Sequence, residues 1–298
     1  MDALLSAEEL QQLQRQVLSY SHQHRPATSA MLGDHRSLFR GQGMELEDTR
    51  PYHFGDDVRH MHWRATARTG KAMTKVFRAD RQREILVMLD RSATMHFGTR
   101  KELKVVTAAR ASASILFMTV AAKESIAGLV VDTKNYHFPA TRGLDGAFAL
   151  LRQMVAPLSD INPAQPATSF ADSIEQTQRV AARGAHIYLI SDFYSLSDSA
   201  ATKLSHLSES HQVTAVHVID VGEERLDATG MLRLRSPKTG RTVIVDTTDK
   251  QLRQRYADRA TQRMAALQQL FARTNIQHLT LYTHHDATTQ LAVLFSYA

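Results

Sequence analysis

Cysteine is absent from the 298 residues of the chain. This absence excludes a disulfide framework, a thiolate-bound zinc or iron–sulfur centre and a cysteine nucleophile, and it is typical of a reducing compartment. Long apolar runs are also missing: the best, residues 115–122, falls far short of the roughly 20 residues that span a bilayer. The N-terminus is acidic and amphipathic, unlike a secretory signal. We therefore expect a cytoplasmic protein without membrane insertion.

Several enzyme motifs are missing as well. The chain has no G-x-x-x-x-G-K-[ST] sequence, so it does not hold ATP through a P-loop of its own. It has no G-x-G-x-x-G after the first predicted strand of the main domain, no G-x-S-x-G and no H-E-x-x-H. These absences argue against a dinucleotide enzyme, an α/β hydrolase and a zinc protease of that type. We expect a protein that is not an enzyme.

Positive charge is concentrated in one segment. The chain carries 36 basic and 30 acidic side chains, for a net charge of +6. Residues 59–83 contain eight lysines and arginines and a single carboxylate, Asp80, so the rest of the chain is nearly neutral. Such a segment suits an anionic partner, although an exposed pair of strands with alternating Arg and Lys explains it as well. Its candidate partner-binding residues are Arg64, Arg68 and Lys71.

Strand and helix patterns alternate after residue 82. Residues 83–90 form an apolar run closed by a carboxylate, which is typical of a buried strand in a parallel sheet. Further strands are predicted at 125–131, 185–190, 212–219 and 276–282, with helices at 101–122, 144–155, 170–182, 199–210, 249–273 and 287–295. Strands separated by single helices predict a doubly wound, mainly parallel α/β sheet. A short edge strand is expected at 136–138.

The predicted domain organisation has two parts. Residues 1–82 form an N-terminal extension that packs on the main domain, with a helix at 7–24 opened by Ser6 and a strand at 72–79. Residues 83–298 form the main domain. A β-hairpin insertion interrupts the main domain at about 220–246, where two alternating segments flank the turn sequence Ser-Pro-Lys-Thr-Gly.

Oxygen donors gather where predicted strands end. Asp90 ends one strand and is followed by Ser92 and Thr94, Asp192 follows another strand, and Thr168 precedes a helix. Ligands bind outside the carboxyl ends of such strands, and residues i and i+2 of an extended segment point to the same side. Because hard oxygen donors suit Mg²⁺ or Mn²⁺, these five residues form a candidate cation site.

Such an ion would remain poorly neutralised if the hydroxyls bound it directly and the carboxylates acted through water. It would then take a further carboxylate, most naturally from a partner protein. In the alternative interpretation, Ser92 and Thr94 cap the next helix and Asp192 pairs with an arginine.

The D-x-S-x-T-M sequence at residues 90–95 resembles the metal-ion-dependent adhesion site of von Willebrand factor A domains. More specifically, the chain resembles the bacterial domain-of-unknown-function family numbered fifty-eight, which is associated with MoxR-type AAA+ ATPases. The matching segments are DTRPYHFGDDVRHMHWRATARTGKAMTKVF, ILVMLDRSATM, HVIDVGEERL and LRSPKTGRTVIVDTTDKQLRQRY. The resemblance runs from about residue 41 to the C-terminus.

This resemblance implies a von Willebrand factor A-type fold and a non-enzymatic binding module or adaptor with a Mg²⁺ adhesion-type site. Its implied partner is a MoxR-like AAA+ ATPase or that ATPase's client protein, in protein maturation or stress response. The chain departs from the family pattern at Thr94, where serine is usual, and at Arg91, whose charge would repel the cation or take its place.

Two other functions stay open at this point. A metal-assisted hydrolase could use Asp90 or Asp192 with a metal-bound water, and a nucleic-acid binder could use residues 59–83. The sequence offers neither a clear general base for the first nor a recognised nucleic-acid motif for the second.

Two expectations concern the segment before the main domain. We expect Trp63, the single tryptophan of the chain, to anchor that segment by packing against the sheet. We also expect Asp56 or Asp57 to pair with Arg59 or Arg68 and so hold a turn in place.

Overall fold

The structure of the protein is a computed structural model that describes residues 3–23, 46–53, 56–58, 61–77, 83–158, 169–194, 196–236 and 240–295. The chain divides into two compact units. The main unit contains Met1–Phe39 and Arg83–Ala298, and the insert unit contains Arg40–Gln82. Each unit is described by itself below.

A six-stranded sheet forms the centre of the main unit, with the strand order β10-β7-β6-β3-β4-β5. Five strands are parallel, and β5 pairs antiparallel with β4 at one edge. The strands are β3 (Glu84–Asp90), β4 (Ser125–Val131), β5 (Asn135–Thr141), β6 (His186–Ser191), β7 (Gln212–Ile219) and β10 (Gln277–Tyr282). The predicted doubly wound, mainly parallel sheet and its edge strand are confirmed.

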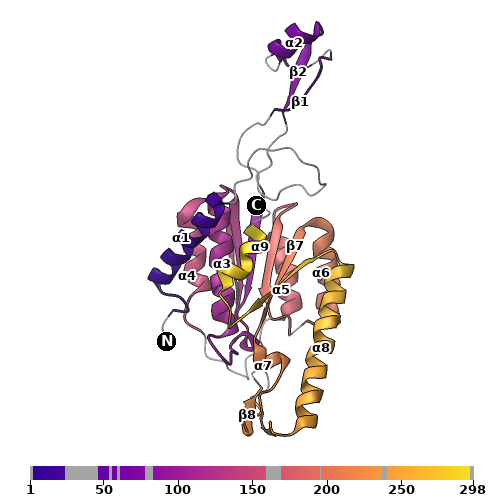
Figure 1. Ribbon diagram of the computed structural model, residues 1–298. Helices are drawn as coiled ribbons and strands as arrows, with labels where there is room; N and C mark the ends of the chain where they lie inside the picture. Colours follow the sequence, from indigo (N-terminus) through magenta and orange to yellow (C-terminus); the bar gives the residue numbers. More distant parts are fainter. Residues whose placement is uncertain are drawn as a thin grey trace. The chain divides into compact units, whose positions relative to one another are not determined.

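Helices cover both faces of this sheet (Figure 1). In β3, Ile85, Val87 and Leu89 join one apolar cluster, whereas Leu86 and Met88 join the other, because successive side chains of a strand point to opposite faces. The first cluster includes α1 (Ala7–Gln23), α3 (Lys104–Ala121), α4 (Gly143–Met154) and α9 (Ala287–Phe295). The second includes α5 (Phe170–Val180), α6 (Asp198–Ser210) and α8 (Lys250–Arg273).

Helix α3 is the most apolar helix of this arrangement. Among the described residues it alone is long and apolar enough to cross a membrane, with a mean hydropathy of 1.3 over 18 residues. A core helix passes the same test, and 78% of this segment is buried within the protein. Its side chains pack between α1, α4 and the sheet, so its apolar composition is explained by its place in the core.

Helix α1 belongs to the main unit. The Ser6 hydroxyl accepts the Glu9 N–H at 3.2 Å while the Ser6 N–H donates to Glu9 Oε2 at 2.8 Å, which is the expected capping box. Leu5, Leu13 and Val17 are buried in the cluster around α3. The predicted extension 1–82 is therefore divided differently in the structure: α1 is part of the main unit, and residues 40–82 form a unit of their own.

The insert unit contains a two-stranded antiparallel sheet of β1 (Leu46–Pro51) and β2 (Met73–Phe77), with the short helix α2 (Trp63–Thr69) between them. Strand β2 was predicted, whereas β1 and α2 were not. The α2 helix ends at Gly70, whose φ of 66° is the left-handed conformation that glycine adopts without strain.

Two expectations concern this unit. Within the insert unit Trp63 is not a packed anchor, because it is 67% exposed at the start of α2. The carboxylate of Asp56 pairs with Arg50 at 2.7 Å and accepts the His53 N–H at 2.9 Å, instead of pairing with Arg68. Arg59 lies outside the described residues, so the expected pairing of Asp57, or of Asp56 with Arg59, stays a prediction.

Candidate functional site

Three carboxylates stand at the ends of neighbouring strands of the main unit. Asp90 ends β3, Asp192 follows β6, and Asp220 follows β7; all three side chains are buried. Because β7, β6 and β3 are adjacent and parallel, their carboxyl ends meet at one edge of the sheet. We call the group formed by these three residues with Lys104 and Glu223 the strand-end cluster.

Asp90 is held by two neutral donors. Its Oδ1 accepts the Ser92 N–H at 2.8 Å, and its Oδ2 accepts the Ser191 hydroxyl at 2.6 Å. The Ser92 and Thr94 hydroxyls lie 3.2 Å apart in the turn that follows. Ser92 precedes the short 3-10 helix η2 (Ala93–Met95) but makes no side-chain capping bond to it, so the helix-cap interpretation does not hold for Ser92.

The environment of Asp90 disfavours its ionised form. Burial is the largest cause, and the negative charge of Asp192 adds to it, so that the pKa of Asp90 is raised to about 6. Hydrogen bonds from Ser191 and Ser92 oppose this shift only in part. Within the described parts of the chain, no lysine, arginine or histidine forms an ion pair with Asp90.

Lys104 supplies the positive charge of the cluster. It is the first residue of α3 and is completely buried, with its Nζ 2.6 Å from Asp192 Oδ2 and 2.7 Å from Glu223 Oε1. The other oxygen of Asp192 accepts the Tyr194 N–H at 2.9 Å. Asp192 therefore pairs with a lysine, where the alternative interpretation had named an arginine, and the sequence analysis missed Lys104 altogether.

Asp220 organises the end of β7. Its side chain caps the short helix α7 (Val221–Glu224) in a capping box with Glu223, and its carboxylate also accepts bonds from Thr99 and from the Thr283 hydroxyl. Burial alone would raise the pKa of Asp220, but the hydrogen bonds from Thr283, Thr99 and Gly222 outweigh it and hold that pKa below its usual value. Its role is structural, since it fixes Glu223 beside Lys104.

Arg91 does not enter the cation site. Its guanidinium donates to the carbonyl oxygens of Gln153 at 2.7 Å, Ala156 at 2.9 Å and Pro157 at 2.8 Å, around the C-terminal end of α4, and its Nε lies 3.4 Å from Asp132. Strand geometry explains this, because the side chain of residue 91 points to the opposite side from residues 90 and 92. The expectation that Arg91 competes with the cation is therefore wrong.

The remaining predicted site residues are placed as follows. Thr168 lies outside the described residues, so its part in the site stays a prediction. Arg64, Arg68 and Lys71 are all exposed on the insert unit; Arg64 and Arg68 are one turn apart on α2, and Lys71 follows the helix.

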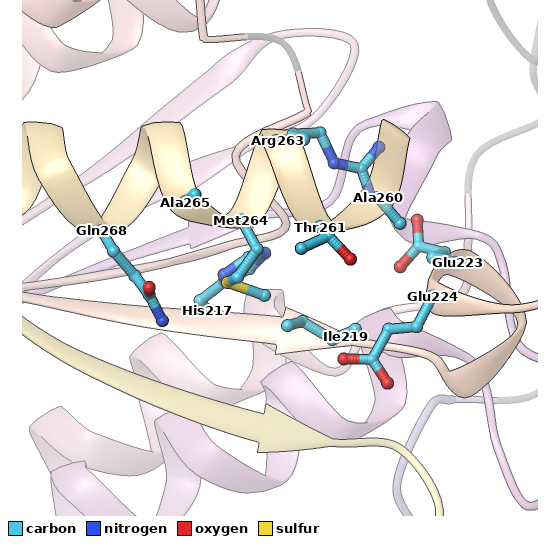
Figure 2. Close-up of a pocket in the computed structure, with 10 residues that line it drawn as sticks. All are labelled: His217, Ile219, Glu223, Glu224, Ala260, Thr261, Arg263, Met264, Ala265 and Gln268. Atoms are coloured by element: carbon cyan, nitrogen blue, oxygen red, sulfur yellow. The ribbon is translucent and has the colours of Figure 1, made fainter. Parts of the chain in front are cut away.

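A cavity of about 300 Å³ adjoins the strand-end cluster. It lies between α8 and the end of β7, and Figure 2 shows His217, Glu223 and Arg263 among the side chains that line it. His217 is buried, and burial together with His278 lowers its pKa to about 3, so its ring is neutral at physiological pH. Among the described residues, no group of three or more His, Asp or Glu side chains is placed to hold a metal ion. A cation site therefore depends on hydroxyl oxygens as well.

The strand order, the helices on both faces and the acidic strand ends define a von Willebrand factor A-type α/β domain. Within that class, the model of the family described as "Protein of unknown function DUF58" matches residues 48–266, and the chain belongs to this family.

The chain is also similar to several relatives and solved structures. The chain is 29% identical over 255 residues to the "Uncharacterized protein Rv1480" of Mycobacterium tuberculosis and the "Uncharacterized protein Mb1516" of Mycobacterium bovis, covering 85% of this chain and 79% of each relative. A crystal structure of the conserved hypothetical protein BatB from Bacteroides thetaiotaomicron is 13% identical, with a TM-score of 0.47, and covers 72% of this chain and 97% of that one. A von Willebrand factor type A structure from Catenulispora acidiphila is 12% identical, with a TM-score of 0.41, and covers 76% and 43%.

Proposed function

We propose that this protein is a non-enzymatic, cytoplasmic protein-binding module that uses its strand-end face to hold a partner. In this proposal Asp90, Ser92 and Thr94 hold a Mg²⁺ ion, with Thr168 as a further ligand. A carboxylate of the partner completes the coordination of the ion. A MoxR-like AAA+ ATPase or its client protein is the proposed partner, and the protein acts as its adaptor in protein maturation or stress response.

The observation that carries the proposal is the environment of the Asp90 carboxylate, which is buried and has no cationic partner among the described residues. It is a buried carboxylate beside a second carboxylate, Asp192, and neutral donors alone are its hydrogen-bond partners. Buried carboxylates are normally paired with a cation or bound to a metal. The Ser92 and Thr94 hydroxyls beside Asp90 complete a set of hard oxygen donors, which fits Mg²⁺. The residues present at Asp90 therefore fit the ion.

Lys104 limits which carboxylates are available to bind the ion. Its ammonium already balances Asp192 and Glu223, so Asp192 is less available as an ion ligand than Asp90. One protein carboxylate leaves a divalent ion with a net positive charge. That residual charge is what would attract an acidic side chain of the partner, and it makes the contact reversible, because several charges must be desolvated on binding.

Thermal unfolding with and without added Mg²⁺ tests the ion site. Binding that stabilises only the folded state contributes about 2.7 kcal/mol at a hundredfold excess of ion over Kd. Mg²⁺ should raise the Tm of the wild type and leave that of Asp90→Ala unchanged. Asp227→Ala, which removes an exposed carboxylate elsewhere on the main unit, is the matched control and should respond like the wild type. Equal responses of the wild type and Asp90→Ala would sink the assignment.

A further inference from the structure

The β-hairpin insertion forms a separate two-stranded ribbon, made of β8 (Met231–Arg235) and β9 (Thr242–Asp246). Figure 1 shows β8 below α7, clear of the six-stranded sheet. The ribbon exposes several large apolar side chains: Met231 is 69% exposed, Val243 is 59% exposed and Ile244 is 61% exposed. A two-stranded ribbon is marginally stable by itself in water, and three or more strands with an apolar face are needed for an independent sheet.

The outer edge of β9 carries backbone groups that the ribbon does not use. Thr247 N–H donates to the Gly230 carbonyl at one end, and Ser236 N–H donates to the Arg241 carbonyl at the other. Hydrogen-bonded and non-bonded pairs alternate along an antiparallel ladder. With the observed register, in which Ile244 faces Arg233, this alternation turns the N–H and C=O groups of residues 242, 244 and 246 outward. Such an edge is a template for a further strand.

The sequence of β9, Thr-Val-Ile-Val-Asp, is self-complementary in antiparallel orientation. If two β9 strands pair about a two-fold axis at Ile244, Ile244 lies opposite its own copy, Val243 lies opposite Val245, and Thr242 lies opposite Asp246. Pairs of β-branched side chains directly opposite each other stabilise a sheet. We propose that this edge binds a second copy of the chain, so that two ribbons form one four-stranded sheet, β8-β9-β9-β8, in a symmetric dimer.

Charge selects the β9 edge over the β8 edge. The same two-fold pairing along β8 would place Arg233 opposite Arg233 of the other copy, and like charges in that position are unfavourable. On β9 the single charged side chain is Asp246, which would face the small, neutral Thr242 of the second copy. Within each ribbon Thr242 pairs with Arg235 of β8. Asp246 of one copy would therefore lie next to Thr242 of the second copy and one strand further from Arg235 of that second copy.

The pairing also extends the apolar surface of the ribbon. Leu232, Leu234, Val243 and Val245 share one face, because each lies opposite another member of the group in the observed register. Pairing two ribbons joins two such faces into a continuous aliphatic surface. This dimer needs neither a metal ion nor a foreign partner, so it stands apart from the proposed function of the strand-end cluster. It obeys the rule that a two-fold interface uses the same patch on both copies.

The oligomeric state of the full chain tests the inference. Sedimentation velocity over a concentration series should show a reversible monomer–dimer equilibrium, unchanged by EDTA. Ile244→Pro removes only an outward-facing N–H, which a strand edge tolerates, and should give a monomer. Arg233→Pro makes the same change on the β8 edge and should still dimerise. Far-ultraviolet circular dichroism and Tm verify that both variants remain folded.

A monomeric wild type at every concentration would overturn the inference, and so would a dimer that survives Ile244→Pro. If Ile244→Pro unfolds the chain, Ile244→Lys replaces it, because two ammonium groups would then meet at the two-fold axis, and the same outcome is expected.

Cross-linking tests the register of the two strands. Because the chain has no cysteine, single substitutions give an unambiguous readout. In the proposed dimer, Val243 and Val245 of the second copy form a non-hydrogen-bonded pair with Cα atoms about 4.5 Å apart, which suits a disulfide. Oxidising a mixture of Val243→Cys and Val245→Cys chains should give the mixed disulfide dimer in excess over either homodimer. A statistical mixture, or cross-linking independent of position, would contradict the register.

Discussion

The ammonium nitrogen of Lys104 lies 2.6 Å from Oδ2 of Asp192, and both side chains are buried. The lysine comes from the first residue of α3 and the aspartate from the end of β6, so this ion pair joins a helix to the edge of the sheet. Glu223 shares the same ammonium at 2.7 Å. The cluster therefore contains a cation supplied by the chain itself, paired with Asp192, whose negative charge in turn acts on Asp90.

Removing the Lys104 ammonium should destabilise the fold severely. Lys104→Met keeps most of the side-chain volume but leaves two buried carboxylates without their counter-ion, and breaking a buried pair in this way costs about 3–5 kcal/mol. Urea unfolding should show this loss. The triple variant Lys104→Met, Asp192→Asn, Glu223→Gln removes the unpaired charges and should recover most of it. No recovery in the triple variant would mean that the packing of Lys104 matters more than its charge.

Arg91 should prove to be a structural residue. Arg91→Met removes the donors to carbonyl oxygens at the end of α4 and in the segment that follows it, and hydrogen bonds to charged groups contribute about 1.5–3 kcal/mol each. We expect a clear loss of urea stability with an unchanged Tm response to Mg²⁺. Arg152→Met, on the exposed side of α4, is the control and should have little effect on either quantity. A larger Mg²⁺ response in Arg91→Met would restore the idea that the guanidinium competes with the ion.

The sheet was predictable because its strands are short apolar runs separated by single helices, as in residues 83–90 and 212–219. β1 was not, because LEDTRP has no apolar alternation, and α2 is too short to show helical periodicity. The exposure of Trp63 could not be read from its residue type, which is more often buried.

The candidate site was predictable only in part. Asp90, Ser92 and Thr94 follow from local spacing and do meet at one edge. Lys104 is separated from Asp192 by 88 residues, so only the folded chain brings them together. One signal was available for Asp220: it closes an apolar strand as Asp90 does, in the segment HVIDVGEERL.

Acid should weaken the fold through His186. Burial, aided by the charge of Arg83, lowers the pKa of this histidine to about 4, and its Nε2 lies 2.8 Å from the Thr214 hydroxyl. In the unfolded chain His186 is protonated below about pH 6.5, whereas in the folded chain it stays neutral down to about pH 4. The free energy of unfolding is therefore unaffected by His186 above pH 6.5. As the pH drops from 6.5 towards 4, protonation of His186 in the unfolded chain lowers that free energy by roughly 3 kcal/mol.

Comparison with His186→Gln isolates this contribution, because the amide does not titrate but can still bond to Thr214. Urea unfolding across this pH range should show a steeper loss for the wild type than for the variant. Parallel pH curves for the two proteins would contradict this assignment, because they would show that His186 titrates normally in the folded chain.

Two surfaces compete as the docking site for the proposed MoxR-like ATPase, and substitutions distinguish them. The strand-end face predicts joint dependence on metal and on hydroxyl ligands. Ser92→Ala combined with Thr168→Ala should weaken binding to the purified ATPase, as measured by titration calorimetry, while leaving circular dichroism unchanged. EDTA should have the same effect on the wild type, and added Mg²⁺ should reverse it, because both treatments remove the ion that bridges to the partner's carboxylate.

The insert unit predicts the opposite pattern. The variant in which Arg64, Arg68 and Lys71 are replaced by alanine removes three exposed cations and leaves the residues of the strand-end cluster unchanged. If the partner binds through the metal bridge, this variant should change the affinity by less than about threefold, as expected for exposed charges. Suppose instead that binding survives both EDTA and the double alanine variant, falls steeply with salt, and is lost in the triple variant. The metal bridge would then be wrong, and the basic residues of the insert unit would be the docking surface. Salt distinguishes the two because it screens contacts between exposed charges, whereas it affects a buried ion bridge much less.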